Sequence, residues 1–542
     1  MSSSTNDWDL TVDVAVIGSG AAALAAAVSA SEAGAQVAVL EGAATFGGTT
    51  ALSGGVAWVP NNSHMAAIGA SDSREDALTY LQRLSLGKCD NRLLEAFVDT
   101  APEAIGFLER ATPLRYRALR YPDYHPEFPG GKTSGRSLDP ELFDGNELGE
   151  LRQYLRPSAQ TPVPITVGDM EQGRLDYEVI AERIQQGLVS SGNALVAALL
   201  KGCMDRQVGL LRETRAQRLV RDDGVVVGVV GEQNGQPLRV ATRRGVVLAT
   251  GGFERNPQLV EQFLRGPLEA SNGSPSNQGD GLVMAMDAGA ALGNMSEAWW
   301  MPMLRIPGEA YEGGDLYRLC IAERTFPGSI IVNRYGQRFV NEAQNYNDLG
   351  RSFHTFDPTR FEYPNLPAWL VFDHDYKTRY PLMTFLPGDP VPTWLSRADT
   401  LVELAAEVGI EAGPLQATVE RFNAYAANGE DPAFHRGESI YDHYNGDRNR
   451  AGAQATLGAL NTPPYYAIRI YAGALGTKGG ALTNEHAQVL DVWGNVIEGL
   501  YAAGNAMAGT TGMAYPGAGG TLGPALTFGY IAGRHAAGRH GD

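Results

Sequence analysis

Short apolar runs that end in small residues recur along the chain. Residues 12–17 (VDVAVI) and 37–40 (VAVL) form the first two runs, and residues 246–248 (VVL) and 500–503 (LYAA) form later ones. Short runs rich in β-branched residues are typical of strands buried in a parallel sheet. The stretch between the first two runs is rich in alanine and predicts a helix that begins near Ala21. The pattern therefore predicts a strand–helix–strand unit that is joined by strands from distant parts of the chain.

A glycine motif follows the first predicted strand. Gly18 and Gly20 turn the chain, and Ala23 takes the third small position of the G-x-G-x-x-G/A pattern. Glycine is needed because a Cβ would block close approach of a pyrophosphate, and the amides of the helix that begins near Ala21 face that anion. Glu41, at the end of the second strand, is placed to accept hydrogen bonds from an adenosine ribose. The combination predicts a dinucleotide site; the alternative is a strand–turn–helix without a ligand, in which the glycine spacing arises by chance.

Small residues continue well beyond the predicted ribose contact. Residues 47–50 (GGTT) and 53–55 (SGG) extend the tract as though backbone lies along a longer cofactor, which favours FAD over NAD. The later strands also end in small residues, and a glycine-led helix closes the chain, so that its N-terminus can face a flavin ring. The residues predicted to bind FAD are Gly18, Gly20, Ala21, Ala22, Glu41, Gly47, Gly48, Thr49, Thr50, Ser53, Gly54, Gly55, Ala249, Thr250, Gly251, Asp280, Gly504, Asn505, Gly520, Thr521 and Leu522.

The pattern changes in the middle of the chain. Residues 181–200 predict a helix, but between about 278 and 444 alanine-rich helices become fewer and aromatic residues more frequent. At 542 residues the chain is too long for one compact core. We therefore predict an α/β protein with a Rossmann-like FAD-binding domain made of residues 1–277 and 445–542. An α+β substrate domain is inserted at residues 278–444.

Composition limits the partners. The net charge of -18, without a long block of Lys or Arg, repels nucleic acids, so we expect small-molecule partners. Cys89, Cys203 and Cys320 lie far apart, which predicts neither a disulfide framework nor a metal site. The chain has no apolar run long enough to cross a bilayer, and its N-terminus lacks a basic region followed by an apolar core. We expect a cytoplasmic protein; peripheral membrane contact and the oligomeric state stay open.

The motifs together resemble one flavoprotein family. The pieces GSGAAA, FGGTTALSGG, YPDYH, ATGGFERNP, PGSIIVNRYGQRFVNE, LGTKGG and YAAGNAMAGTTGMAYPGAGG occur in this order along essentially the whole chain. They are similar to the flavin-dependent 3-ketosteroid Δ1-dehydrogenases, within the wider fumarate reductase and succinate dehydrogenase flavoprotein class. The flavin motifs are common to that class, whereas the tyrosine positions are far more selective.

The resemblance implies roles for four residues. The family's enzymes remove two hydrogens from adjacent carbons beside a ring ketone, one as a hydride to flavin N5 and one as a proton to a tyrosine. Tyr346 matches the tyrosine that abstracts the proton, and Tyr124 matches the tyrosine that supports it. Tyr515 and the backbone amide of Gly519 match the pair that hydrogen-bonds the ketone oxygen. The resemblance therefore implies FAD-dependent 1,2-desaturation of a 3-ketosteroid, a small apolar ketone.

The chemistry is consistent with these residue types. A proton beside a carbonyl is acidic only while donors hold the carbonyl oxygen and stabilise the developing enolate, and a tyrosine hydroxyl with a fixed backbone amide supplies two. Tyrosine has a reference pKa of about 10, so a competent base near pH 7 needs roughly 4 kcal/mol of phenolate stabilisation. A second tyrosine or a positive potential nearby can supply it. The chain holds 22 tyrosines, and most are expected to serve packing alone.

The motifs of related enzyme families match this sequence less well. Dicarboxylate reductases of the class typically place an arginine proton donor five residues after the Asn of G-x-R-F-V-N-E, where this chain has Tyr346, and carry an R-L-G-G that this chain lacks. The 3-ketosteroid Δ4-dehydrogenases usually place a serine where this chain has Gly517. Two alternatives stay open: a dehydrogenase of small cyclic ketones such as cyclohexanone derivatives, and a non-catalytic flavin electron carrier. The electron acceptor, whether quinone, carrier or oxygen, is also open.

Overall fold

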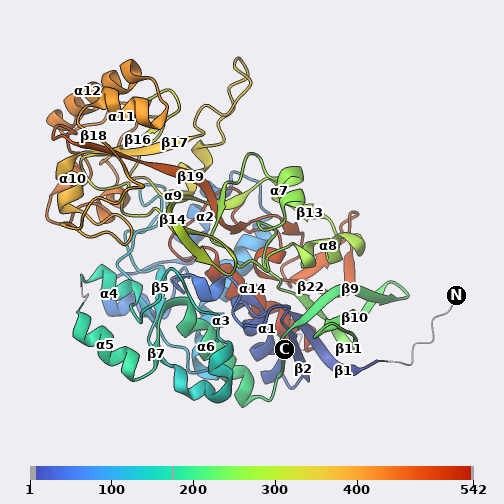
Figure 1. Cartoon of the computed structure of the whole chain (residues 1–542). Helices are drawn as coiled ribbons and strands as arrows, with labels where there is room; N and C mark the ends of the chain where they lie inside the picture. The colour runs from blue at the N-terminus through green and yellow to red at the C-terminus, as the bar shows by residue number, and fades with distance from the viewer. Residues whose placement is uncertain (1–7, 174–175, 539–542) are drawn as a thin grey trace.

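The chain folds into two lobes (Figure 1). The computed structural model describes residues 8–173 and 176–538. Residues 1–7 belong to the N-terminal segment in which the sequence predicts no signal peptide, and they lie outside the described residues. The lower lobe in Figure 1 contains the first and last elements of the chain, and the upper lobe is formed from its middle part, coloured yellow and orange. This arrangement confirms the predicted α/β fold class, with a nucleotide-binding lobe assembled from both ends of the chain.

The lower lobe is built on an eight-stranded sheet ordered β21-β22-β11-β1-β2-β8, with β10 and β9 attached beyond β11. The central strand β1 pairs in parallel with β2 and β11, and β22 pairs in parallel with β11, so a strand from the end of the chain enters the sheet formed at its beginning. Its strands are β1 (Leu10–Ile17), β2 (Val37–Leu40), β8 (Gly209–Leu211), β9 (Thr214–Asp222), β10 (Val225–Gln233), β11 (Gln236–Leu248), β21 (Gln488–Leu490) and β22 (Val496–Ala502).

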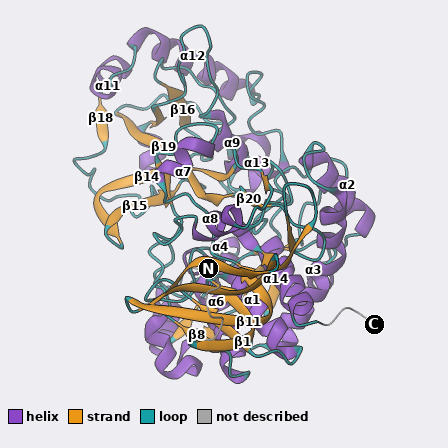
Figure 2. Ribbon diagram, turned by 90° about the vertical axis from the view of Figure 1, so that its right-hand side faces the viewer, coloured by secondary structure: helices purple, strands orange, loops and turns teal. Residues whose placement is uncertain are grey.

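Helices α1 (Ala21–Glu32) and α14 (Leu522–Ala536) pack together beside this sheet (Figure 2). They touch at backbone level, because a Cβ on Gly529 would lie 2.3 Å from the carbonyl oxygen of Ala22. A Cβ on Gly533 would lie 2.2 Å from the carbonyl oxygen of Ala26. Glycine at these two positions of α14 therefore allows the last helix to lie directly against the first.

The upper lobe is built on a second sheet of seven strands, ordered β15-β14-β19-β17-β16, with β12 and β18 attached to β19. The long strand β19 pairs antiparallel with both β14 and β17, so it joins the two parts of this sheet. Its strands are β12 (Ala270–Ser271), β14 (Ala298–Tyr311), β15 (Gly314–Leu319), β16 (Ser329–Asn333), β17 (Ala368–Phe372), β18 (Ser396–Ala398) and β19 (Tyr465–Thr477). Strands of this sheet thus extend on both sides of residues 278–444, and the domain boundaries stay a prediction.

The remaining elements cover the two sheets. The helices are α2 (Arg74–Ser85), α3 (Asn91–Ala111), α4 (Val167–Glu171), α5 (Tyr177–Gln185), α6 (Ser191–Asp205), α7 (Pro257–Phe263), α8 (Asp280–Asp287), α9 (Tyr346–Ser352), α10 (His374–Arg379), α11 (Leu401–Val408), α12 (Ala412–Asn428) and α13 (Ile440–Tyr444). Short strands form three further small sheets: β3 (Ala57–Trp58) and β4 (Tyr116–Ala118) with β5 (Ser137–Pro140), β6 (Phe143–Asp144) with β7 (Leu188–Val189), and β13 (Leu292–Gly293) with β20 (Gly480–Ala481).

The helix predicted for residues 181–200 is wrong in one respect. The chain leaves the helical path after α5 and resumes it as α6, because Gly187 has a φ of 77° and β7 intervenes. Positive φ suits glycine, whose missing Cβ removes the steric penalty. None of the described helices, in residues 8–173 and 176–538, combines the length and the apolar character needed to cross a membrane.

Candidate active site

One large cavity lies where the two lobes meet, with a volume of about 1400 Å³. Of the residues predicted to bind FAD, those that line it are Gly18, Gly20, Ala21, Ala22, Glu41, Gly48, Thr49, Thr50, Ser53, Gly54, Gly55, Ala249, Thr250, Gly251, Asp280, Gly504, Asn505, Thr521 and Leu522. Gly47 and Gly520 are not among the lining residues. Their amides bond within the chain, that of Gly47 to the Ser19 hydroxyl at 2.9 Å and that of Gly520 to the Gly517 carbonyl at 2.9 Å.

Glycine is required where the first strand turns into α1. Gly18 has a φ of 105°, and a Cβ there would lie 2.4 Å from the Ala249 carbonyl oxygen on the neighbouring strand. Gly48 has a φ of 49° and lines the cavity, with open space where its Cβ would project. The N-terminal residues of α1 line the same wall, and a helix N-terminus offers free amides and a favourable dipole to an anion.

Glu41 lies at the cavity as a buried carboxylate. The Ser19 hydroxyl donates to one of its oxygens at 2.5 Å, and the Ala43 amide donates to the other at 2.8 Å. Burial raises the pKa of Glu41, and the hydrogen bond from Ser19 acts in the opposite direction. Further along the wall, Asp280 is paired with Arg215 at 2.7 Å, a partner that the sequence did not indicate.

These features fit a bound FAD. Gly18, Gly20 and Gly48, called here the glycine cradle, would hold its pyrophosphate together with the N-terminus of α1. Glu41 would accept hydrogen bonds from its ribose. A volume of about 1400 Å³ exceeds the roughly 300–1,000 Å³ of ordinary ligand pockets, so the cavity has room for a second molecule beside the cofactor. Within the described residues, no group of three or more His, Cys, Asp or Glu side chains could hold a metal ion.

Three tyrosines from distant parts of the chain meet in this cavity. The ring centroids of Tyr124 and Tyr346 lie 5.2 Å apart, those of Tyr124 and Tyr515 lie 5.2 Å apart, and those of Tyr346 and Tyr515 lie 5.4 Å apart. All three rings are buried and line the cavity together with Gly519. The structure thus brings together the four residues for which the resemblance implies catalytic roles.

Some hydrogen-bond donors stay free in the part of the cavity formed by Tyr124, Tyr346 and Tyr515, called here the tyrosine corner. The Thr521 hydroxyl donates to the Tyr515 oxygen at 2.9 Å, so the hydrogen of Tyr515 can point elsewhere. No described residue accepts the Gly519 amide hydrogen, although Gly519 lines the cavity. The buried hydroxyl of Tyr124 has no hydrogen-bond partner among the described residues. Because unpaired buried polar groups are costly, free donors that converge on a cavity indicate a ligand with an acceptor atom.

Tyr346 is a weak acid when the cavity holds only protein. Burial raises its pKa well above the usual value, the neighbouring Tyr515 adds to the shift, and Tyr124 opposes it. Burial also raises the pKa of Tyr515, against the hydrogen bond from Thr521. Of the two neighbouring tyrosines, Tyr124 is the one that lowers the pKa of Tyr346.

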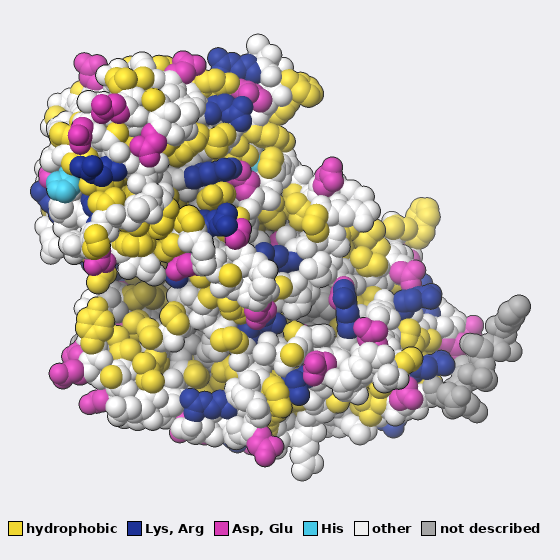
Figure 3. Space-filling model, in the orientation of Figure 1, with side chains coloured by type: hydrophobic (Ala, Val, Ile, Leu, Met, Phe, Trp, Pro, Cys, Tyr) yellow, Lys and Arg dark blue, Asp and Glu magenta, His cyan; other side chains and the backbone are white. Residues whose placement is uncertain are grey.

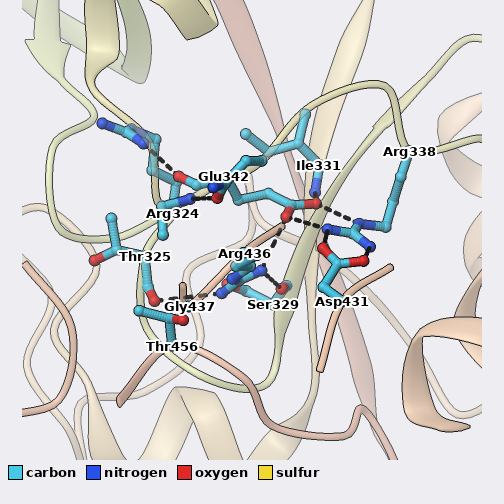
Figure 4. Close-up of polar contacts among 12 residues, drawn as sticks. Arg324, Thr325, Ser329, Ile331, Arg338, Glu342, Asp431, Arg436, Gly437 and Thr456 are labelled. Atoms are coloured by element: carbon cyan, nitrogen blue, oxygen red, sulfur yellow. Dashed lines mark hydrogen bonds and ion pairs between the residues drawn. The ribbon is translucent and has the colours of Figure 1, made fainter. Parts of the chain in front are cut away.

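A buried ion network holds the segment that precedes Tyr346 (Figure 4). Glu342 binds Arg338 at 2.7 Å and Arg436 at 3.1 Å, and Arg338 also binds Asp431 at 2.7 Å. Arg324 donates to the backbone carbonyls of Glu342 and of residue 344, the latter at 2.7 Å. The polar residues of the GQRFVNE motif thus fix the backbone that leads into α9, whose first residue is Tyr346.

Lys478 supports the segment that carries Tyr515. Its ammonium group donates to the carbonyl oxygens of Gly512, at 3.1 Å, and of Ala514. It also lies 4.0 Å from the centre of the Trp299 ring, which packs edge-on against Tyr515. Burial lowers the pKa of Lys478 to about 7. No role for Lys478 could be predicted from the sequence, because only the fold shows that T-K-G-G lies behind the Tyr515 loop.

Aromatic residues extend the cavity outward from the three tyrosines. The Tyr121 ring lies 6.4 Å from that of Tyr124 and 4.3 Å from that of Tyr444, and the Arg448 guanidinium lies 5.6 Å from the Tyr444 ring. Leu319, Ile321, Phe326 and Tyr380 also line this arm. The lining reaches Met170 at α4, and apolar side chains gather on the surface over α4 and α5 (Figure 3). Only the aromatic density of residues 120–137 could have indicated this arm from the sequence.

Known proteins resemble the chain over nearly its full length. The FAD binding domain family matches residues 13–522. The 4-oxocyclohexanecarboxylate 2-dehydrogenase of Sinomonas cyclohexanicum is 42% identical over 98% of this chain and 93% of its own. The 3-oxosteroid 1-dehydrogenase of Mycobacterium tuberculosis is 38% identical over 98% of this chain and 99% of its own.

Solved structures resemble it as well. The 3-ketosteroid Δ1-dehydrogenase of Sterolibacterium denitrificans, in complex with 1,4-androstadiene-3,17-dione, superposes with a TM-score of 0.91 at 38% identity over 97% of this chain and 99% of that one. The FAD-binding fold and the family predicted from the sequence are both confirmed. The chain is an FAD-dependent oxidoreductase and belongs to the flavin-dependent 3-ketosteroid Δ1-dehydrogenase family.

Proposed function

We propose that this protein introduces the 1,2 double bond into a 3-ketosteroid. The observation that supports the proposal is the triangle of tyrosine rings, with sides of 5.2 to 5.4 Å, in the same cavity as the glycine cradle. These residues carry hydroxyl groups, whereas a dicarboxylate reductase is expected to have an arginine at the position of Tyr346. Within the described chain, the segments that supply these hydroxyls come from both lobes, so the site forms only when the lobes are joined.

In this proposal Tyr515 and Gly519 hold the ketone oxygen. The Tyr515 hydrogen is free because its oxygen accepts from Thr521 at 2.9 Å, and the Gly519 amide has no acceptor among the described residues. Two donors on the ketone oxygen stabilise the negative charge that develops when the neighbouring carbon loses a proton. This stabilisation makes the α-hydrogen acidic enough for a tyrosine to remove.

Tyr346 takes the α-proton on its phenolic oxygen. Burial raises its pKa well above the ordinary value, so ionisation of Tyr346 has to be coupled to the arrival of a ketone and to the hydroxyl of Tyr124. The apolar walls around the three rings keep water away from the proton that is transferred. The chemistry that bound FAD supplies is acceptance of the hydride that leaves the β-carbon.

The aromatic arm supports a substrate with several rings. Tyr121, Tyr444, Phe326 and Tyr380 continue the apolar wall away from the catalytic corner, which gives contact surface to carbons far from the ketone. Relatives named as 3-oxosteroid 1-dehydrogenases, at 38% identity, support the same substrate class.

We also propose a cytoplasmic location, which fractionation of cells would test.

A dehydrogenase of small cyclic ketones is the second candidate. It is supported by the relative named as a 4-oxocyclohexanecarboxylate 2-dehydrogenase, at 42% identity. The two candidates are separated by mixing the oxidised holoenzyme anaerobically with a panel of 3-ketosteroids and cyclohexanone derivatives. We expect steroids to bleach the oxidised flavin band rapidly. Bleaching by one-ring ketones alone would show that the steroid proposal is wrong.

A further inference from the structure

An ion pair joins the two segments that carry Tyr124 and Tyr346. His125, which directly follows Tyr124, places its Nε2 atom 2.8 Å from a carboxylate oxygen of Asp348. Asp348 lies in the first turn of α9, two residues after Tyr346. The segments are 223 positions apart in the sequence, so this pair is a direct polar link between them.

We propose that the His125–Asp348 pair is a positioning device that aims the Tyr124 hydroxyl at Tyr346; the inference rests on the proposed function. Tyr124 needs such a device because its hydroxyl has no hydrogen-bond partner among the described residues, so no bond of its own fixes it. Its direction is set by the backbone on either side. A displacement of about 1 Å in a catalytic group can cost about 10²-fold in rate.

The backbone at this point is held from the other side by the Tyr515 segment. The Tyr124 amide donates to the Pro516 carbonyl at 3.0 Å, and the His125 amide donates to the Tyr80 oxygen at 3.2 Å. The Tyr80 hydroxyl in turn donates to the same Pro516 carbonyl at 2.7 Å. With the bond between His125 and Asp348, the Tyr124 segment is therefore linked to the segments of both other tyrosines.

The surroundings of His125 favour a well-defined geometry. Its ring stacks on Phe128 with centroids 4.5 Å apart, and Asn345 donates to the shared Asp348 oxygen at 3.0 Å. The side chains of His125 and Asp348 are 21% and 34% exposed, whereas those of the surface pair His435–Glu438 are 71% and 62% exposed. Partial burial reduces solvent screening, so the inner pair is held more firmly than the surface pair.

The link is strongest while the imidazole is charged. The charged groups that face it are Glu127 of its own loop and Asp348 of α9, and the Asn345 side-chain amide lies 3.3 Å from its Nε2 atom. Burial acts to lower the pKa of His125, but Asp348 and Glu127 together raise it to about 9. A raised pKa means that the ion pair is complete below the ordinary histidine pKa and is lost as the pH rises through about 9.

The test uses the holoenzyme and measures anaerobic flavin reduction by a 3-ketosteroid between pH 6 and pH 10. His125→Ala removes the link, and we expect reduction about three- to tenfold slower at pH 7.5, no more than the loss expected when the Tyr124 hydroxyl itself is removed, with steroid affinity changed less than about twofold. His125→Gln keeps a donor near the Nε2 position without a titratable charge. We expect it to recover most of the rate and to lack the decline that we expect of the wild type near pH 9.

His435→Ala is the matched control, because it removes a histidine of an exposed pair, and its rate should equal that of the wild type. A His125→Ala rate within twofold of the wild type would overturn the proposal, as would an unchanged alkaline decline in His125→Gln. A wild type that no ketone reduces would instead overturn the proposed function.

If no ketone reduces the wild type, the His125–Asp348 pair can still be tested by a measurement that needs no turnover. Histidine labelled with ¹³C should give a His125 resonance that titrates near pH 9 and moves to lower pH in Asp348→Asn. An Asp348→Asn titration identical to that of the wild type would show that the pair does not exist in solution.

Discussion

The cofactor cradle and the tyrosine corner occupy the same cavity but are built differently. The cradle consists of backbone and small side chains from residues 18–22, 48–55 and 249–251, each adjacent to a strand or helix of the lower lobe. The corner consists of Tyr124, Tyr346 and Tyr515, which come from loops and the start of one short helix. The first region depends on glycines such as Gly18, where a Cβ would clash, and the second on a hydroxyl that each residue carries.

The difference lies in what holds each region in place. A glycine in the cradle is positioned by its own strand and turn, and at Gly18 the Ala249 carbonyl oxygen leaves no space for a Cβ. A tyrosine in the corner is positioned by partners far away in the sequence, such as the arginines around Glu342 and the lysine behind Trp299. Cofactor binding should therefore be broken by single added methyl groups, and catalysis by the loss of single oxygens.

The largest effect is expected from Gly18→Ala. The added Cβ would lie 2.4 Å from the Ala249 carbonyl oxygen, so β1 and β11 cannot keep their places and bound flavin should be lost. Gly34→Ala is the control, because Gly34 also has positive φ, 85°, but its Cβ would meet nothing within 4 Å. The ratio of flavin to protein absorbance in the purified variants measures the effect. Full flavin content in Gly18→Ala would contradict the cradle.

Tyr515→Phe should leave flavin bound and slow its reduction. One of the two donors to the ketone oxygen is removed, and loss of one such donor typically costs about 10²- to 10³-fold in rate. The control is Tyr177→Phe, which changes a side chain that is 78% exposed. Stopped-flow reduction of both variants by a 3-ketosteroid gives the comparison, and equal rates would remove Tyr515 from the site.

Tyr124→Phe should have a smaller effect, about tenfold, because Tyr124 supports the base without contacting the proton that moves. The pH dependence of the reduction rate is a more specific readout of this role than the rate at one pH. Tyr124 opposes the rise in the pKa of Tyr346, so its loss should move the rising limb of the profile to higher pH. A profile that keeps its midpoint would show that Tyr124 only packs.

Glu342→Gln should affect stability more than turnover. It leaves Arg338 and Arg436 buried beside a neutral group, and breaking a buried pair from one side typically costs about 3–5 kcal/mol. Burial alone would raise the pKa of Glu342, but the two arginines hold it below its usual range. The stabilisation is therefore present above the ordinary glutamate pKa and lost as the pH falls through the lower, folded-state value.

Thermal unfolding of Glu342→Gln and wild type between pH 3 and pH 8 checks this expectation. The two unfolding temperatures should differ most near neutral pH and approach one another in acid. Glu438→Gln, which alters the exposed pair with His435, should unfold like the wild type at every pH. A difference that is constant with pH would rule out the ionised pair as the cause.

The cradle could be predicted in detail because its information is local. Strand, glycine turn, helix and acid follow one another within residues 12–41, and the return of a last strand to β11 follows from its apolar run and small ending. The two predicted residues that do not line the cavity, Gly47 and Gly520, are glycines whose amides bond within the chain. Spacing alone does not separate glycines that face a ligand from glycines that pack.

The corner could be predicted only as a set of separate tyrosines. The resemblance indicated Tyr124, Tyr346 and Tyr515 among 22 tyrosines, but it gave neither Lys478 behind Tyr515 nor Asp348 beside His125. Lys478 bonds to a residue 36 positions away and Asp348 to one 223 positions away, between loops whose relative placement depends on the packing of two lobes. Such contacts have no periodicity or local motif, so the sequence carries no signal for them.

The most direct test of the central claim compares wild type and Tyr346→Phe in a single turnover. Both proteins are prepared with equal flavin content and mixed anaerobically with a 3-ketosteroid while the oxidised flavin band is followed. The proposed mechanism predicts rapid bleaching in the wild type and bleaching about 10²- to 10⁴-fold slower in the variant, because the group that accepts the α-proton is missing. Equal rates in the two proteins would contradict it.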